Sequence, residues 1–272
     1  MQRNEASGLF TEPSIMNTRA SHKTEAILMR SLDYGESDRI VTFYTRDYGK
    51  IRGIAKGARR SRKRFANALE LFCCSQIVFS RKGRDGLALI EESRVHHHFE
   101  NIRLDLDKTL ISSYLIELTD QFTLEDKKST DLFALLHDFL AQVDGADCTE
   151  ALMRFFEIRL LTCVGYQPVL DRCVACQAPL NGADAYQFNA RAGGVRCSAC
   201  HRTGEASLSC STGTLKTLLM GRDVELSRMS RLLMSEQSAL ESRQIMLHFI
   251  RHLLGKELKS LQVFHQVRKI GL

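Results

Sequence analysis

The spacing of apolar residues changes near residue 100, and this change divides the chain into two kinds of structure. Before it, short runs rich in apolar and β-branched residues alternate with turn residues, a pattern typical of strands. The runs are Ala26 to Leu32, Arg39 to Thr45, Lys50 to Lys56, Leu71 to Ser80 and Leu87 to Glu91. Five short strands of this kind predict a small closed barrel of the OB type, and a five-stranded barrel of the SH3 type is nearly as compatible.

After residue 100 the apolar residues follow the period of helices. One amphipathic helix is indicated by Leu132, Leu135, Leu136, Phe139, Leu140 and Val143, with Ser129 as its expected N-cap. Another helix upstream runs through Leu110, Tyr114, Leu118 and Phe122, and a third follows Asp147 and stops near Gly165. Residues 212–272 are helical again, so the second part is predicted to be a helical domain.

Four cysteines form two Cys-x-x-Cys pairs, Cys173 with Cys176 and Cys197 with Cys200, with 20 residues between the pairs. This spacing is typical of a structural zinc site in which each pair supplies two thiolates from one tight turn. Residues 171–210 have few large apolar side chains, so this segment needs a metal to hold it together. Four thiolates also leave no open position for water, which argues against a catalytic zinc. We therefore expect one structural Zn²⁺, with His201 and Cys210 as nearby alternative ligands.

Positive charge is concentrated in the first part of the chain. The net charge is +6, but residues 1–99 carry 18 Lys and Arg against 11 Asp and Glu, whereas residues 100–145 carry four against ten. This asymmetry suggests that the first part meets an anion. No apolar run is long enough to span a membrane and residues 1–20 lack a secretory signal, so the sequence predicts a cytoplasmic protein with no membrane partner.

An uninterrupted basic stretch lies in and after the third predicted strand. Between Tyr48 and Leu69 there are eight Lys and Arg residues, beginning with Lys50, and no acidic residue. Arg52 and Lys56 alternate onto one face of the strand, and the following loop extends that face. Phosphate oxygens along a nucleic acid suit this array. The predicted DNA-binding residues are therefore Arg52, Lys56, Arg59, Arg60, Arg62, Lys63 and Arg64; a merely solvated charged loop is the alternative.

Neighbouring residues could extend this interface. Arg81, Lys82 and Arg84 lie in the next hairpin and could widen the basic surface. Phe65, Phe43 and Tyr44 could stack on bases, although a place in the core suits each of them at least as well.

The fold class predicted from these patterns is α+β and multidomain. An N-terminal five-stranded OB barrel precedes a C-terminal helical domain into which the four-cysteine element is inserted. The expected boundaries are a disordered tail at 1–20, the OB domain at 21–97, helical parts at 98–170 and 211–272, and the zinc element at 171–210.

Three stretches resemble one family, the bacterial recombination mediator RecO. The first runs from Gly35-Glu36-Ser37-Asp38-Arg39-Ile40 through Phe43-Tyr44-Thr45 and Gly49-Lys50 to Lys56-Gly57-Ala58-Arg59-Arg60. The second is Arg154-Phe155-Phe156-Glu157, Leu160-Leu161 and Gly165-Tyr166-Gln167-Pro168, leading into Cys173. The third is Phe188, Gly193-Gly194 and Cys197-x-x-Cys200. Together they lie within residues 24–200.

This resemblance implies functions that the residue patterns do not themselves establish. It implies binding to single- and double-stranded DNA, annealing of complementary strands, and a nucleoid-associated location in the cytoplasm. It also implies partnership with RecR and with the single-stranded DNA-binding protein SSB, so that RecA can be loaded. Because residues 100–145 are acidic, the acidic tail of SSB would find its contacts near Arg154 and Arg159 or after residue 200.

Two other classes of protein combine similar parts. A zinc-containing DNA ligase or nuclease fragment would be an enzyme, but the chain lacks a nucleotidyl lysine motif and a carboxylate pair in the basic region. A zinc-ribbon transcription factor would bind particular DNA sequences rather than any sequence. The sequence therefore favours a non-enzymatic DNA-binding protein of recombination and repair.

Overall fold

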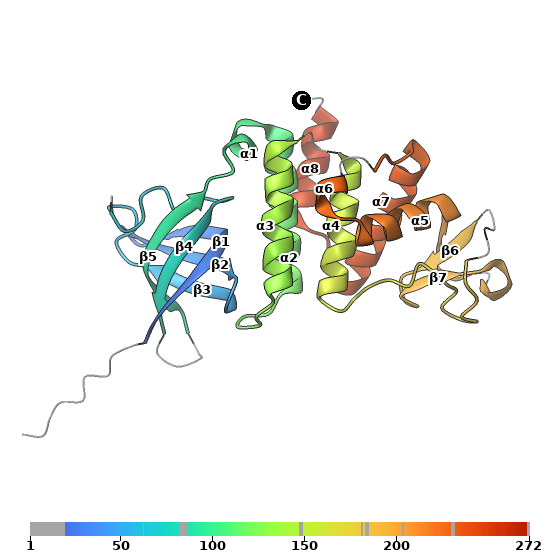
Figure 1. Ribbon diagram of the computed structural model, residues 1–272, viewed down its shortest axis with the longest axis horizontal. Helices are drawn as coiled ribbons and strands as arrows, with labels where there is room; N and C mark the ends of the chain where they lie inside the picture. The colour runs from blue at the N-terminus through green and yellow to red at the C-terminus, as the bar shows by residue number, and fades with distance from the viewer. Residues whose placement is uncertain are drawn as a thin grey trace, which may run out of the picture.

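The computed structural model of the chain describes residues 20–61, 63–81, 86–146, 149–180, 182, 185–202, 204–229 and 232–270. A β-barrel lies at one end of an elongated molecule, helices fill the middle, and a small sheet lies at the other end (Figure 1). The predicted disordered tail lies outside the described residues except for Ala20, and so do Arg62, Lys82 and Arg84.

Five strands form the barrel: β1 (Ser21–Tyr34), β2 (Asp38–Thr45), β3 (Gly49–Ala55), β4 (Cys74–Ser80) and β5 (Ala88–His97). Strand β1 pairs with both β2 and β4, and β3 pairs with β5, so the order β1-β2-β3-β5-β4 closes on itself. The β3–β5 pair is parallel and the others are antiparallel. This order is that of an OB barrel, which confirms the predicted fold over the SH3-type alternative.

Side chains that alternate across the strands build the barrel core. In β3, Ile51 and Ala55 are fully buried whereas Arg52 between them is exposed. Ile51 belongs to a buried cluster with Leu28, Phe43, Ile77 and Ile90 from the other four strands. Strand β1 extends beyond its predicted apolar run, because its exposed end continues to pair with the start of β2 in a hairpin.

The described residues form the helices α1 (Glu100–Leu104), α2 (Leu106–Phe122), α3 (Thr130–Gly145), α4 (Glu150–Cys163), α5 (Thr212–Asp223), α6 (Leu226–Met229), α7 (Glu236–Leu254) and α8 (Lys259–Ile270). Ser129 caps α3 as predicted, and its side chain accepts a hydrogen bond from the Leu132 N–H at 3.2 Å. Asp147 lies outside the described residues, and Thr149 caps α4 by accepting from the Leu152 N–H at 3.3 Å. None of the helices in the described ranges is long and apolar enough to cross a membrane.

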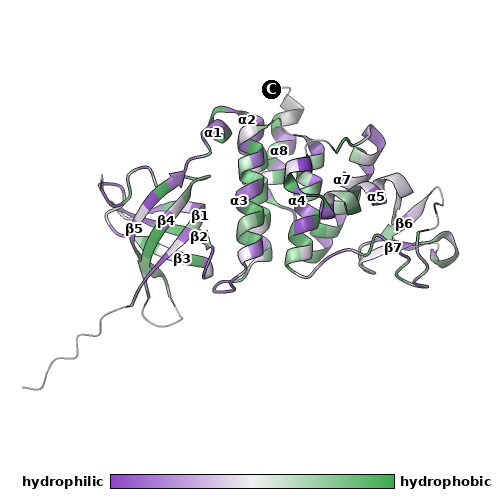
Figure 2. Cartoon of the chain, in the orientation of Figure 1, coloured by the Kyte–Doolittle hydropathy of each residue, from purple (hydrophilic) through white to green (hydrophobic). Residues whose placement is uncertain are grey.

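Helix α4 lies at the centre of the helical domain and packs against α3, α5 and α7. Both its aromatic residues, Phe155 and Phe156, are fully buried. A Cβ atom on Gly221 would lie only 1.9 Å from a ring carbon of Phe155, so the backbone of α5 rests directly on α4. Helix α3 shows the predicted amphipathic pattern, with apolar and polar colours along its length in Figure 2 and with Leu136 and Phe139 on its buried face.

A small sheet of order β7-β6-β8 is built from β6 (Tyr186–Asn189), β7 (Gly194–Arg196) and β8 (Leu208–Cys210). It lies at the end of the molecule opposite the barrel (Figure 1). Phe188 joins it to the helical domain, because its ring meets that of Phe249 in α7 edge-to-face with centroids 5.6 Å apart. The four-cysteine element is therefore seated on the helices that surround it in the sequence.

The connection between α2 and α3 rests on the β2–β3 turn and joins the barrel to the helices. Gly49 begins β3 with φ +68°, and a Cβ atom there would lie 2.1 Å from the carbonyl oxygen of Lys127. Only glycine allows the two backbones to approach this closely.

We expect Gly49→Ala to lower the free energy of unfolding by about 2–3 kcal/mol, because it adds a steric clash to a left-handed backbone. Urea unfolding measures this change. Gly35→Ala is the matched control, since Gly35 has φ +59° but open space around its Cβ position. The control should lose less, about 1–2 kcal/mol from the left-handed backbone alone; equal losses in the two variants would contradict the close approach.

Candidate metal centre and nucleic-acid interface

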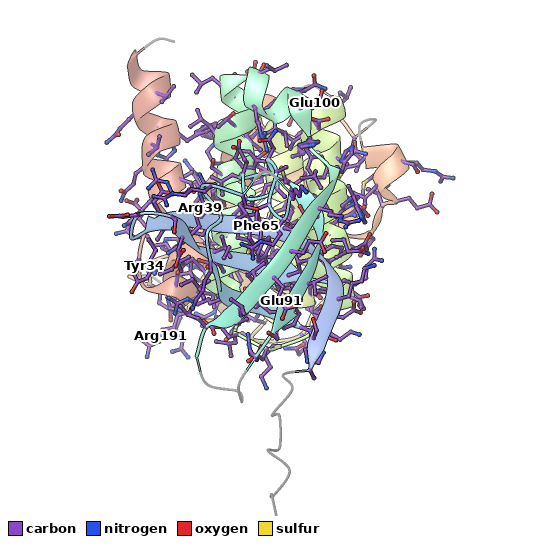
Figure 3. The ribbon with its side chains drawn as sticks, turned by 90° about the vertical axis from the view of Figure 1, so that its left-hand side faces the viewer. Tyr34, Arg39, Phe65, Glu91, Glu100 and Arg191 are labelled. Atoms are coloured by element: carbon purple, nitrogen blue, oxygen red, sulfur yellow. The ribbon has the colours of Figure 1, made fainter. Side chains whose placement is uncertain are left out.

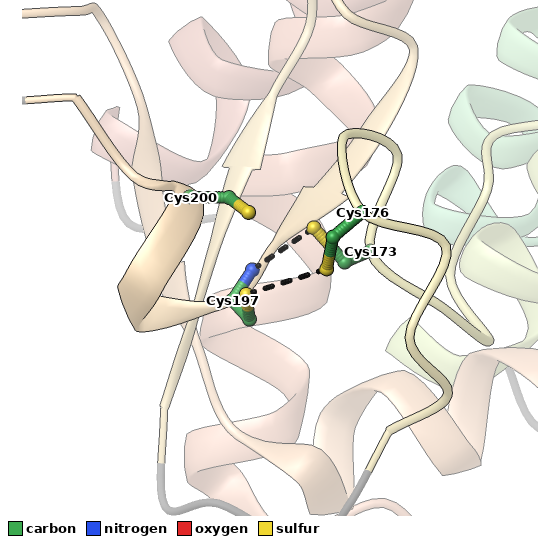
Figure 4. A group of neighbouring side chains, drawn as sticks. All are labelled: Cys173, Cys176, Cys197 and Cys200. Atoms are coloured by element: carbon green, nitrogen blue, oxygen red, sulfur yellow. Dashed lines mark hydrogen bonds between the residues drawn. The ribbon is translucent and has the colours of Figure 1, made fainter.

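The four predicted zinc ligands are brought together in the small-sheet element (Figure 4). The Sγ atoms of Cys173, Cys176, Cys197 and Cys200 all lie within 4.8 Å of one another. The alternative ligand Cys210 is buried in β8 instead, where its Sγ donates to the Tyr186 carbonyl at 3.5 Å. Within the ranges that the structure describes, no second cluster of His, Cys, Asp or Glu could hold a metal.

Two tight turns and one strand contact position the thiols. In the first turn the Gln177 N–H donates to the Cys173 carbonyl at 2.9 Å, and in the second the Cys200 N–H donates to the Cys197 carbonyl at 3.0 Å. The turns are brought together because the Val174 N–H donates to the carbonyl of Val195 in β7 at 2.8 Å. Each Cys-x-x-Cys pair thus has a fixed local geometry, and the sheet sets the distance between the pairs.

This arrangement fits a tetrahedral metal ion with soft ligands. A tetrahedron with metal–sulfur distances of about 2.3 Å has edges of about 3.8 Å, and the Sγ atoms of Cys176 and Cys197 are 3.9 Å apart. Burial raises the pKa of the Cys173 thiol, but hydrogen bonds from the backbone N–H groups of Cys176, Cys197 and Ala175 outweigh burial and lower this pKa to about 6. These backbone hydrogen bonds favour the thiolate at Cys173, which is the form that binds a metal.

The predicted DNA-binding residues lie on β3 and in the segment that follows it. Six of them are described, and all six are exposed: Arg52, Lys56, Arg59, Arg60, Lys63 and Arg64. The segment is fastened to the barrel, since the Gly57 N–H donates to Asp38 at 2.8 Å and the Ser93 N–H donates to the Arg64 carbonyl at 2.9 Å. The backbone of this segment is therefore fixed on the barrel, and its basic side chains project from it into solvent, where an extended anion could bind them.

Carboxylates lie close to three of these arginines, which the sequence did not reveal. Arg59 is 3.7 Å from Asp33 and Arg60 is 3.8 Å from Glu36, both in the β1–β2 hairpin. Arg52 is 3.7 Å from Glu125, in the connection between α2 and α3. Exposed ion pairs of this kind are worth about 0–1 kcal/mol, so phosphate groups can compete for the arginines.

Two basic residues near the predicted interface bind the helical domain instead. The Nζ atom of Lys50 donates to the carbonyl and to the carboxylate of Asp120 in α2, at 2.7 and 3.0 Å. Arg81 donates to both carboxylate oxygens of Asp126, at 2.7 and 2.6 Å. Part of the charge asymmetry between residues 1–99 and 100–145 is therefore neutralised within the molecule.

The aromatic residues considered for base stacking lie in the barrel and its surroundings. Phe43 and Tyr44 are fully buried and Phe65 is nearly so. They pack in apolar clusters, so the structure supports the alternative, a place in the core, for all three residues. An aromatic side chain that is exposed on the barrel is Tyr34, near the tip of the β1–β2 hairpin, where it pairs with Asp38 (Figure 3).

The two arginines of α4 considered for the SSB tail are used inside the helical domain. Arg154 is 1% exposed and lies 2.7 Å from Glu157, which also accepts a hydrogen bond from Tyr114. Burial raises the pKa of Glu157 to about 7, although Arg154 acts in the opposite direction. Arg159 donates to the carbonyls of Gly221 and Val224 and so ties α4 to the end of α5. Neither arginine fits the expected contact with an incoming peptide.

An OB barrel, a helical domain and an inserted four-cysteine element together define the class of this protein, a multidomain OB-fold protein with a candidate structural metal centre. Comparison with known proteins identifies the family within this class. The family model for the N-terminal part of recombination protein O matches residues 16–99, and that for the C-terminal part matches residues 103–262. The chain belongs to the RecO family of DNA repair and recombination proteins, which confirms the resemblance noted in the sequence.

Individual relatives agree with this assignment over almost their whole length. The DNA repair protein RecO of Syntrophus aciditrophicus is 52% identical over 259 residues, which cover 94% of this chain and 100% of the relative. Those of Geobacter metallireducens and Desulfatibacillum aliphaticivorans are 35% and 34% identical, over 91% and 90% of this chain and 98% and 97% of the relatives.

Proposed function

We propose that this protein binds single- and double-stranded DNA through its barrel and anneals complementary strands. The observation that carries the proposal is the group of exposed basic side chains that the structure describes between Lys56 and Arg64, held on an OB barrel in a chain of the RecO family. OB barrels commonly bind nucleic acids along one face. In this proposal the contact residues are Arg52, Lys56, Arg59, Arg60, Arg62, Lys63 and Arg64.

Annealing by such a surface needs no acid, base or nucleophile. Two complementary strands repel each other because each carries one negative charge per phosphate. A surface that neutralises part of both strands lets pairing begin, and base pairing then supplies the free energy. The protein therefore acts without consuming a nucleotide and is not an enzyme in the ordinary sense.

In the same proposal Cys173, Cys176, Cys197 and Cys200 hold one Zn²⁺. The soft thiolate donors and the near-tetrahedral spacing support zinc as the metal. The ion would supply folding energy to the small-sheet element. Because four protein ligands would fill its coordination sphere, the ion would have no open position for water and no catalytic role.

Family membership also supports a set of partners for this chain. We propose that RecR and SSB bind it, so that RecA is loaded indirectly onto DNA that SSB covers, in the nucleoid. The direct test is annealing of complementary SSB-coated oligonucleotides by the purified protein without ATP. Acceleration over the uncatalysed rate is expected, and failure to anneal both coated and naked strands would contradict the proposal.

A further inference from the structure

The connection between α2 and α3 is fixed on the barrel by its backbone. The Asp126 N–H donates to the Lys50 carbonyl at 3.1 Å, and Glu125 forms a β-bridge with Lys50. The carbonyl of Lys127 lies over Gly49. The carboxylates of this connection are therefore held at set places beside the barrel.

Asp126 acts as an anchor. It holds Arg81 with two short contacts from the same guanidinium nitrogen, and the Arg81 side chain is only 15% exposed. A phosphate group on an extended strand has little access to a guanidinium covered in this way. Asp126 thus positions the connection and leaves Arg81 out of the exposed basic surface.

Glu125, the preceding residue, has a different environment. Its side chain is 44% exposed, and its carboxylate lies 3.7 Å from the guanidinium of Arg52, whose side chain is 56% exposed. Both groups are open to solvent and the contact is long, so the carboxylate can move away at little cost. Arg52 is the one proposed DNA contact for which a carboxylate from the helical domain lies within ion-pair distance among the described residues.

We propose that Glu125 is an intramolecular competitor of phosphate for Arg52. This inference rests on the proposed DNA binding by the barrel and deepens it. A strand that lies along β3 must displace the Glu125 carboxylate before a phosphate can bind Arg52. The contact therefore weakens DNA binding at one end of the basic surface and lets a strand be released there more readily.

The test is Glu125→Gln, which keeps the size of the side chain and removes its charge. Affinity for a single-stranded oligonucleotide at low salt should rise about two- to fivefold, the worth of one exposed ion pair. The plot of log affinity against log salt should steepen by about 0.7, as expected for one more neutralised phosphate. Glu100→Gln is the matched control: it changes the net charge equally, but Glu100 lies in α1, before the start of α2, whereas Glu125 follows the end of this helix, which is about 25 Å long. The control should leave both values near those of the unmodified protein.

A double-mutant cycle with Arg52→Ala identifies the route of the effect. In the Arg52→Ala background, Glu125→Gln should change affinity by less than a third of its effect in the unmodified protein, because the group it would release is gone. An equal gain in both backgrounds, or no gain from Glu125→Gln alone, overturns the competition. Replacement of Arg59, Arg60 and Lys63 by alanine, measured in parallel, separates the two proposals. If this variant loses affinity for DNA while Glu125→Gln has no effect, DNA binding by the barrel is supported and only the competition is wrong.

Discussion

Replacement of both Cys173 and Cys176 by serine is expected to abolish metal binding and to unfold the small-sheet element. Structural zinc contributes about 10–16 kcal/mol in zinc-finger peptides, which is at least comparable with the whole net stability of a typical domain. Residues 171–202 provide few buried side chains besides Tyr186, Phe188 and Val195, so packing alone does not replace this energy. Lower solubility should follow, because the face of Phe188 that meets Phe249 would become exposed.

Metal analysis of the purified chain measures this effect. The unmodified protein should carry one zinc per chain and the double variant almost none. Cys163→Ser is the matched control, because Cys163 is an exposed free thiol outside the cluster; this variant should keep its zinc. Full zinc occupancy in the double variant would show that the ligands are other residues. Since the barrel lies at the opposite end of the molecule (Figure 1), DNA binding should survive loss of the metal.

Removal of four charges from the basic segment is expected to produce the second large effect. If about six phosphates are neutralised on a single strand, log affinity should fall against log salt with a slope near −4. Replacing Arg59, Arg60, Arg62 and Lys63 by alanine should flatten the slope by up to about 3 and weaken all DNA sequences alike. Fluorescence anisotropy at several salt concentrations measures both quantities.

The matched control removes the same number of charges from the other half of the molecule. Arg191, Lys216, Arg228 and Lys256 are all exposed there and can be replaced by alanine together. In this control the slope of log affinity against log salt should remain close to that of the unmodified protein. If instead the slope flattens in the control and is unchanged in the barrel variant, the DNA site lies on the helical half.

Much of the fold could be predicted from patterns among residues that are close together in the sequence. The strands of the barrel could be predicted because Ile51 and Ala55 alternate with Arg52 around turns such as the one ending in Gly49. The cysteine cluster could be predicted because the chemistry of thiolates fixes the spacing within each pair. In both cases the information lies within a few residues of the structure it specifies.

Contacts between distant parts of the chain limited the prediction of the nucleic-acid interface. Lys50 and Arg52 read as equivalent cations in the sequence, yet Asp120 holds the first and Glu125 lies beside the second, both more than 60 residues away. Arg154 is a charged residue of the kind usually found at a surface, but its side chain is buried within the helical domain. No local pattern indicates such partners, because they depend on how the helical domain meets the barrel.

The most direct test of the account is an annealing time course with labelled complementary oligonucleotides, at fixed ionic strength and without ATP. The account predicts that charge, rather than any single side chain, sets the rate. Exchange of Arg59 and Arg60 for lysine should therefore keep most of the activity, although some stacking of guanidinium groups on bases is lost. Stepwise replacement of the same residues and Lys63 by alanine should lower the rate progressively. A strict requirement for ATP, or complete loss of annealing on one charge-preserving exchange, would contradict the account and indicate a chemical site.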